Sequence, residues 1–232
     1  MKVLNLLLIC AFFAACGPRP ASIDDASTSN SRSLNTQVSN ANIITGFSSP
    51  ESVIGIDTLV FVSNVGKALK PVDKDGDGFI SKLGYSGKVI DRQFIGGLDA
   101  PKGMAIWDSV LYVADIDKIR AFNWKTGGSL DIFDFEPYKV KFLNDLCKGD
   151  SGFLYASATF QDKLYHIDVY RRGKTSPISP QAIPKDAQVK SVNGLWYDAP
   201  VGDLYIAGFG DNDSTNGKIA VIPLGPRAVA PR

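Results

Sequence analysis

Four similar segments of the chain each carry a polar residue at an equivalent place: Glu51, Lys102, Asn144 and Asn193. Each of these residues lies 11 to 13 residues before the equivalent residue of a following apolar run. Carboxylate and amide oxygens that converge on one point suit a hard divalent cation such as Ca²⁺ or Mg²⁺. The same residue types also stabilise turns, so on their own these positions indicate either a polar site or ordinary loop structure.

A second acidic motif begins at Asp73, where the sequence reads DKDGDGFIS. It matches the first nine positions of an EF-hand calcium loop, with carboxylates at Asp73, Asp75 and Asp77. The twelfth position is Gly84, where the EF-hand motif has a bidentate glutamate, and the flanking residues have the pattern of strands. The segment is therefore either a second, weak calcium loop or an acidic surface loop.

The four polar residues belong to a unit that recurs with a period of about 43 to 51 residues. Each unit has a short apolar stretch, a turn, and a second apolar stretch that reads LVFVSN, VLYVAD, FLYASA or DLYIAG. This period is typical of propeller blades made of four short antiparallel strands. We find no amphipathic helix pattern, so the sequence predicts an all-β fold, a β-propeller over residues 45–224.

The first strand of each predicted blade covers residues 53–56, 104–107, 145–147 or 195–197, so the polar residues immediately precede or begin it. In a propeller this strand lines the central channel, and the polar residues would form a ring at one mouth. The fourth unit reaches only its third strand, and residues 225–232 read as an unstructured tail. Because a propeller closes its ring, we expect these units to be about four blades of a larger, truncated propeller.

The amino-terminal residues predict export. Residues 1–15 form a signal peptide with one lysine and a short apolar run, and the segment FAAC ending at Cys16 resembles a bacterial lipobox. Cys16 would then carry lipid and anchor the chain to the membrane, on the periplasmic side of the outer membrane or at the cell surface. The alternative is ordinary cleavage after Ala15. Residues 16–44 are rich in Ser, Asn and Thr and predict a flexible tether.

Charge and cysteine content exclude other classes. The chain has 25 basic and 24 acidic residues, a net charge of +1, and no basic stripe interleaved with aromatic residues, which argues against nucleic-acid binding. Of three cysteines, Cys10 lies in the signal peptide and Cys16 at its end. Only Cys147 belongs to the repeats, where a small buried hydrophobe is expected, so there is no disulfide framework.

Three of the repeated segments resemble the senescence-marker-protein/gluconolactonase/LRE-like family of six-bladed, regucalcin-like propellers, which includes lactone hydrolases. SPESV resembles the family segment with a metal-ligand glutamate, here Glu51, and VNGLWYD the segment with a metal-ligand asparagine, here Asn193. FLNDL resembles the segment whose asparagine, here Asn144, faces the substrate and the metal-bound water. The resemblance covers roughly residues 47–224.

The resemblance implies a divalent cation, Ca²⁺ or Mg²⁺, and a small lactone-like ligand. It also implies a further aspartate, both ligand and general base, in a later D-G segment that the sequence after Asn193 lacks. Lactone hydrolysis needs a polarised carbonyl and a deprotonated water, so we expect a site related to metal-dependent hydrolases but incomplete. The alternative is a non-catalytic propeller that binds a small ligand or a protein partner, since this fold hosts both.

Overall fold

The computed structural model describes residues 43–171, 177–211 and 216–225. Residues from Gly46 onward form one compact unit, which is described by itself below. The predicted signal peptide, Cys16, almost all of the tether and nearly all of the tail lie outside the described residues. No helix in the described part of the chain is long and apolar enough to cross a membrane.

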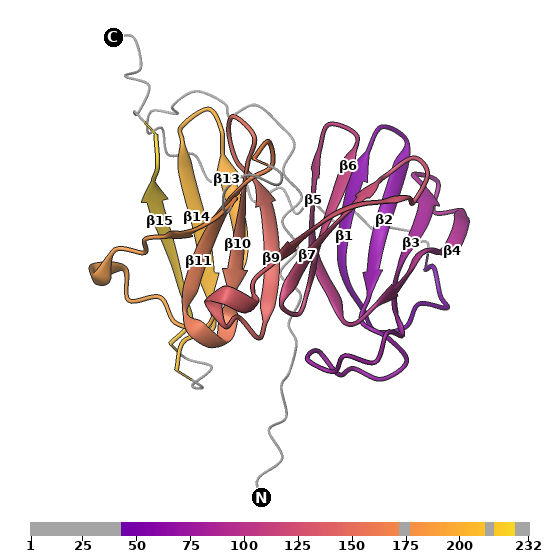
Figure 1. Cartoon of the computed structure of the whole chain (residues 1–232), viewed down its shortest axis with the longest axis horizontal. Helices are drawn as coiled ribbons and strands as arrows, with labels where there is room; N and C mark the ends of the chain where they lie inside the picture. The colour runs from indigo at the N-terminus through magenta and orange to yellow at the C-terminus, as the bar shows by residue number, and fades with distance from the viewer. Residues whose placement is uncertain (1–42, 172–176, 212–215, 226–232) are drawn as a thin grey trace, which may run out of the picture. The chain divides into compact units, whose positions relative to one another are not determined.

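The unit from Gly46 is built from four antiparallel sheets, each a meander of consecutive strands (Figure 1). Sheet 1 contains β1 (Pro50–Ile56), β2 (Leu59–Asn64), β3 (Gly78–Gly84) and β4 (Val89–Leu98). Sheet 2 contains β5 (Pro101–Trp107), β6 (Val110–Asp115), β7 (Lys118–Asn123) and β8 (Ser129–Asp134). Sheet 3 contains β9 (Leu143–Lys148), β10 (Phe153–Ala158), β11 (Lys163–Asp168) and β12 (Ile178–Gln181). Sheet 4 contains β13 (Val192–Asp198), β14 (Asp203–Gly208) and β15 (Lys218–Pro223).

This arrangement confirms the predicted blades: three have four strands, and the fourth has three within the described residues. The only helical elements there are short 3₁₀ turns, η1 (Glu136–Tyr138), η2 (Thr159–Gln161) and η3 (Lys185–Ala187). The first strands of successive sheets contact one another, β1 with β5, β5 with β9 and β9 with β13. We call these four the inner strands. The fold is therefore that of a partial β-propeller.

The turns between the first two strands of a sheet follow from local sequence. Asp57 and Asp108 stand at the start of these turns with φ of 53° and 52°. Aspartate tolerates this left-handed conformation better than most residues, so each places a tight reversal after an apolar strand. The third and fourth sheets use Gly152 and Gly202 at φ of 86° and 78° in the same turn.

The core lies between the sheets, in separate apolar clusters. One cluster fills the space between sheets 1 and 2 and includes Phe61, Leu111 and Trp124. A larger one lies between sheets 2 and 3, and a third between sheets 3 and 4. Each sheet is thus stabilised by side chains on the face that meets its neighbour. Burial of each large apolar side chain contributes about 1.5–3 kcal/mol to the free energy of folding.

Candidate functional site: the bulges of the inner strands

Every inner strand carries a β-bulge at the same place. In β1 the regular pairing with β2 breaks between Pro50 and Val53, where two residues face the single residue Ser63. The bulges contain Glu51–Ser52, Lys102–Gly103, Asn144–Asp145 and Asn193–Gly194. The four residues singled out from the sequence therefore share one structural position, the first of the bulge, and we call them the bulge residues.

The inner strands begin earlier than predicted. The sequence pattern placed the bulge residues at or before the start of each strand, whereas β1 begins at Pro50, β5 at Pro101 and β13 at Val192. The reason is the bulge itself, because an extra residue breaks the alternation of apolar and polar side chains from which strands are read. Bulges re-aim side chains and are common next to functional sites.

Serine hydroxyls support two of the bulges. The backbone N–H of Ser52 donates to Ser63 Oγ at 2.9 Å, and the N–H of Asp145 donates to Ser157 Oγ at 2.9 Å. The Ser157 hydroxyl in turn donates to the carbonyl of Asn193 at 2.6 Å. These bonds satisfy backbone groups that the bulge removes from the ladder, and the last one joins the bulges of sheets 3 and 4.

Three charged side chains from three sheets interact at the bulges. The pKa of the half-buried Glu51 carboxyl is raised to about 7, chiefly because burial disfavours its charge. The nearby Asp145 carboxylate adds to this rise, whereas the Lys102 ammonium opposes it. Glu51 from β1, Lys102 from β5 and Asp145 from β9 therefore form one electrostatic cluster, which we call the bulge cluster.

Lys102 is the most buried cation of the described residues, with 1% of its surface exposed. Its Nζ donates to the carbonyl of Ala100 at 2.7 Å and lies 4.7 Å from the centre of the Phe142 ring. Burial lowers the pKa of Lys102 to about 8, while the carboxylates of Glu51 and Asp115 act in the opposite direction. Burial brings the pKa values of both Glu51 and Lys102 toward neutral, and their mutual attraction opposes this effect in each group.

Asp145 is the member of the cluster that sequence reasoning missed. Its Oδ2 accepts the N–H of Leu195 at 2.7 Å, and its Oδ1 accepts the N–H of Leu146 at 2.8 Å. Burial raises the pKa of Asp145 to about 6, against the effect of these two bonds. The site therefore holds a second carboxylate beside Glu51, one that was not among the residues singled out from the sequence. Asp145 directly follows Asn144, and regular strand alternation would place their side chains on opposite faces. The bulge breaks this alternation, so the sequence pattern gave no signal for Asp145.

The donor types at the bulges fit a hard divalent cation. Glu51 offers a carboxylate, and Asn193 and Asn144 offer amide oxygens, the class of ligand that Ca²⁺ and Mg²⁺ prefer. Asn144 is buried and Asn193 half-buried. The described residues contain no group of three or more His, Cys, Asp or Glu side chains placed to hold a metal, so a cation would depend on the amides. Lys102 would compete with it for Glu51.

The acidic motif of the first sheet lies in the loop between β2 and β3. Asp73 forms an ion pair with Lys70 at 3.0 Å, and Asp77 Oδ2 accepts the N–H of Lys67 at 3.0 Å. Asp75 Oδ1 accepts the N–H of Asp77 at 3.3 Å. Each of the three carboxylates thus has a partner within the loop, and the calcium loop stays a prediction.

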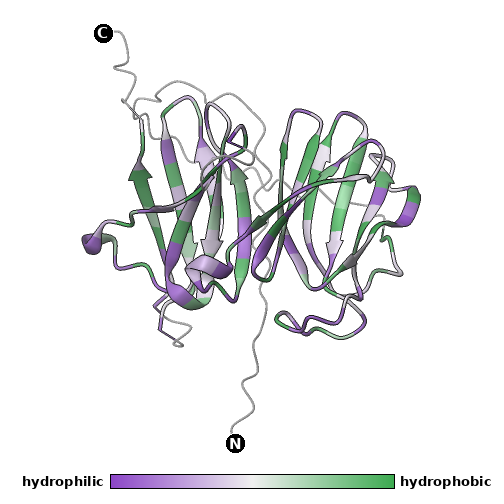
Figure 2. Cartoon of the chain, viewed as in Figure 1, coloured by the Kyte–Doolittle hydropathy of each residue, from purple (hydrophilic) through white to green (hydrophobic). Residues whose placement is uncertain are grey.

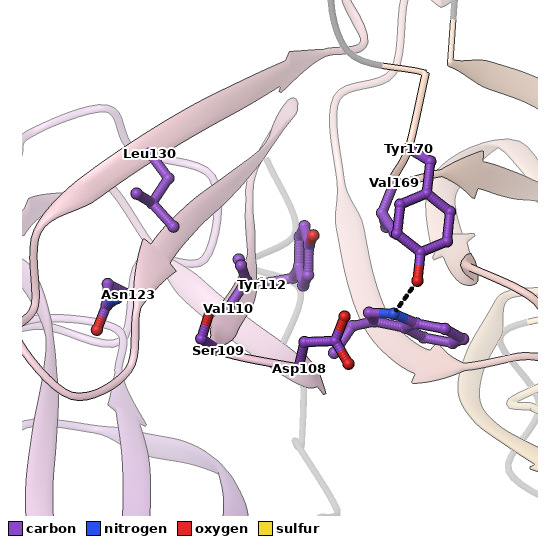
Figure 3. Close-up of a pocket in the computed structure, with 9 residues that line it drawn as sticks. Asp108, Ser109, Val110, Tyr112, Asn123, Leu130, Val169 and Tyr170 are labelled. Atoms are coloured by element: carbon purple, nitrogen blue, oxygen red, sulfur yellow. Dashed lines mark hydrogen bonds between the residues drawn. The ribbon is translucent and has the colours of Figure 1, made fainter.

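One cavity formed by the described residues lies away from the bulges. It has a volume of about 410 Å³ and opens between sheets 2 and 3 beside Trp107 and Tyr170 (Figure 3). Two of its lining residues are joined, since Trp107 Nε1 donates to the Tyr170 hydroxyl at 2.9 Å. Trp107 ends β5 and Lys102 lies near its start, about 16 Å away at ~3.3 Å per strand residue. The cavity is lined by none of the bulge residues.

Comparison with solved structures supports the propeller fold. A luciferin-regenerating enzyme is 16% identical with a TM-score of 0.54, over 73% of this chain and 59% of its own. A gluconolactonase from Xanthomonas campestris is 18% identical with a TM-score of 0.53, over the same shares of the two chains. Regucalcin from Agrobacterium tumefaciens, a calcium-binding protein, is 14% identical with a TM-score of 0.50, over 68% and 52%.

These neighbours are propellers of the kind that the SPESV, FLNDL and VNGLWYD segments predicted, and the predicted likeness in fold is confirmed. The chain spans between half and three-fifths of the length of each of them. Searches with protein-family models and among curated proteins found no match. At these identities the comparisons show the fold, and activity has to be argued from the site.

Proposed function

We propose that this chain binds a small lactone-like or ester ligand at the bulge residues, together with a divalent cation, Ca²⁺ or Mg²⁺. The observation that carries the proposal is the recurrence of one bulge in four inner strands, which brings Glu51, Asn144 and Asn193 to equivalent positions. Glu51 and Asn193 would hold the cation, and Asn144 would orient the ligand. The fold shared with a gluconolactonase supports this choice of ligand class.

The chain's own residues suggest how the ligand would be held. A bound cation would polarise the ligand carbonyl. The amide N–H₂ of Asn144 would donate to a ring or carbonyl oxygen. The Glu51 carboxyl, with a pKa of about 7, changes charge near neutral pH and would adapt to the arriving cation. Lys102 would balance Glu51 when no cation is bound.

Hydrolysis of the ligand needs a catalytic group that we do not find among the described residues. A hydrolase needs a base for the attacking water in addition to the cation ligands. Asp145 is the second carboxylate of the cluster, but backbone N–H groups occupy both of its oxygens. We therefore propose that this chain binds the ligand. Hydrolysis would need a further carboxylate, beyond the described residues, to act as the base for the attacking water. The engagement of Asp145 favours this non-catalytic binding, and hydrolysis of the ligand by the chain is the second candidate.

The experiment is a thermal-shift titration of the full chain with Ca²⁺ and Mg²⁺, with and without five- and six-membered sugar lactones, followed by an assay of lactone opening. We expect each cation to raise Tm and the lactone to raise it further. Glu51→Gln should abolish both shifts, while Glu136→Gln in the exposed η1 should keep them. Cation and lactone effects without turnover support the binding proposal, and turnover by this chain supports the hydrolase. Equal shifts in Glu51→Gln and wild type would contradict the site.

We also propose that the chain is exported and anchored to a membrane by lipid on Cys16. The support is the sequence of residues 1–16, with its apolar run and the FAAC segment. Expression in a bacterial host with labelled palmitate should give a labelled protein in the membrane fraction. Cys16→Ser should lose both label and membrane association, whereas Cys147→Ser, a half-buried cysteine of β9, should keep both. Label retained in Cys16→Ser would refute the assignment.

A further inference from the structure

Two aromatic side chains stand at right angles in the cavity between sheets 2 and 3. The rings of Trp107 and Tyr170 have an interplanar angle of 89° and centroids 6.2 Å apart. Tyr170 is 66% exposed, yet its ring packs on Gly152, where an added Cβ would lie 2.2 Å from Tyr170 Cε2. This contact and the hydrogen bond from Trp107 fix an exposed aromatic ring in place. Such a ring offers contact area to a ligand at a low cost in conformational entropy.

Trp107 departs from the repeat of the blades. It ends the inner strand of sheet 2 and pairs with Val110 at the turn. The residues in the corresponding last pair of sheets 1 and 4 are Ile56 and Asp198. The fold therefore accepts an aliphatic or a charged side chain at this position, so the turn does not need an aromatic ring. Residues that depart from the pattern of a fold in this way are candidates for function.

The turn between β5 and β6 supplies polar groups beside the two rings. Trp124 fixes this turn, because its Nε1 donates to the Asp108 carbonyl at 3.0 Å and its backbone N–H to the Ser109 carbonyl at 3.2 Å. The Asp108 carboxylate and the Ser109 hydroxyl are exposed, and neither is bonded by another of the described residues. Asn123 Oδ1 accepts two backbone N–H groups at 2.9 and 3.1 Å, which leaves its N–H₂ group as a donor for a ligand.

Another part of the lining is apolar. Val110, Tyr112 and Val169 are buried members of the cluster between sheets 2 and 3. Figure 2 shows hydrophobic residues along the strands and hydrophilic residues along most of the connecting loops. The cavity lies at this boundary, because β6 supplies Val110 and Tyr112 while the turn before it supplies the polar groups (Figure 3). A ligand here would meet apolar carbon on one side and hydrogen-bonding groups on the other, as in most small-molecule sites.

The charges around the cavity decide between classes of ligand. Asp108 is the one charged side chain among the described residues that line it, so an anionic ligand would be repelled. The Lys148 ammonium lies 4.4 Å from the centre of the Trp107 ring, so this ring already interacts with a cation and a second cation would be repelled. A neutral ligand with hydroxyl groups avoids both effects. Its hydroxyls can donate to the Asp108 carboxylate and accept from the Asn123 N–H₂ group.

We propose that this cavity binds a neutral saccharide of one or two rings. The C–H groups on one face of a sugar ring would pack on the aromatic pair. The hydroxyl groups at its edge would bond Asp108, Ser109 and Asn123. The cavity volume of about 410 Å³ is within the range of small-molecule sites. Because none of the bulge residues lines the cavity, the inference does not depend on the ligand or cation proposed above.

Calorimetric titration of the full chain with methyl glucoside, maltose and cellobiose tests the proposal, in EDTA so that no cation occupies the bulge residues. We expect at least one saccharide to bind with a Kd on the order of 1 mM. Tyr170→Ala should weaken this binding by on the order of tenfold. Tyr170→Phe keeps the ring without its bond to Trp107 and should weaken binding less. Tyr85→Ala is the matched control, since Tyr85 is 62% exposed and lies outside the cavity.

Asp108→Asn supplies the second arm. Asparagine tolerates the φ of 52° at this turn, so the fold should be kept while the carboxylate is lost. We expect saccharide binding to weaken by about fivefold. Asp57→Asn, at the equivalent turn of sheet 1 with φ of 53°, should bind as wild type does. Binding that is unchanged in Tyr170→Ala, or no binding of any of the three saccharides, would overturn the proposal. Binding of tetramethylammonium in their place, lost in Tyr170→Ala, would also overturn it and indicate a cation site.

Discussion

Asp145 Oδ2 accepts the backbone N–H of Leu195 at 2.7 Å, and this bond joins the inner strand of sheet 3 to that of sheet 4. The second oxygen of the same carboxylate accepts the N–H of Leu146 at 2.8 Å. The two donors fix the carboxylate in the third bulge, beside Glu51. A side chain that the sequence did not single out thus holds two sheets in register at the candidate site.

Asp145→Asn tests this role. Asparagine has one carbonyl oxygen, so its N–H₂ group must face one of the two backbone donors, and a buried N–H then loses its acceptor. We expect the variant to lose about 1–3 kcal/mol of unfolding free energy in urea. Asp57→Asn, in an exposed turn, should change it by less than about 0.5 kcal/mol. Equal losses of unfolding free energy in both variants would show that the Asp145 carboxylate does not stabilise the contact between sheets 3 and 4.

Gly103→Ala tests the close approach of sheets 2 and 3. The new Cβ would lie 2.4 Å from Asp145 Oδ1 and 2.8 Å from the carbonyl of Asn144, so the bulges must separate. We expect a loss of about 1–3 kcal/mol in unfolding free energy. Gly96→Ala in β4 is the matched control, because nothing lies within 4 Å of the added Cβ. If neither Gly103→Ala nor Gly96→Ala changed the unfolding free energy, the close packing of sheets 2 and 3 at Gly103 would be contradicted.

The stability of the protein should depend on the charge of Glu51. Its pKa is about 7 in the folded state against 4.5 in the reference state, so the folded state holds the proton more tightly. The stability that this proton confers is fully present below pH 4.5 and is lost as the pH rises through about 7.

Glu51→Gln removes this dependence. We expect the variant to match wild type near pH 4.5 and to be more stable by about 1–2 kcal/mol at pH 7.5, a value reduced from the full linkage effect because the group is half-exposed. Chemical unfolding of both proteins across this pH range gives the comparison. A stability difference that stays constant with pH would show that Glu51 has an ordinary pKa.

Lys102→Met should strengthen cation binding. The ammonium of Lys102 interacts with the Glu51 carboxylate, and a divalent cation at Glu51 would be repelled by it. Methionine keeps the buried volume without the charge. We expect the apparent Kd for Ca²⁺ to fall by on the order of tenfold at low salt. Lys118→Met, a change at a partly exposed lysine paired with Asp117, should leave the affinity unchanged. Weaker binding in Lys102→Met would mean that Lys102 helps to hold the cation.

The fold could be read from the sequence because the apolar runs recur. VLYVAD and DLYIAG have the same alternation and the same small residues at the end, and both form the second strand of a sheet. The pattern also showed that Glu51, Lys102, Asn144 and Asn193 are equivalent. The period alone carries this information, since each sheet repeats the same packing on its neighbour.

The rest of the site could not be read because it depends on contacts between sheets. The two donors to Asp145 lie in two different strands, and its bond to Leu195 in sheet 4 spans 50 residues of sequence. The burial of Lys102 depends on the approach of Phe142, which lies far along the sequence just before β9, and no local pattern encodes it. Alternation failed at the bulges, where two residues face one, and these are the positions that place the polar side chains.

Calorimetric titration of Ca²⁺ into the full chain is the most direct test of the central claim, that Glu51 and Asn193 of the bulge residues hold a cation. The comparison is between wild type, Asn193→Leu and the triple variant Asp73→Asn, Asp75→Asn, Asp77→Asn. We predict binding by wild type and by the triple variant, and its loss in Asn193→Leu. Binding that survives in Asn193→Leu and disappears in the triple variant would place the cation in the loop between β2 and β3 and contradict the account.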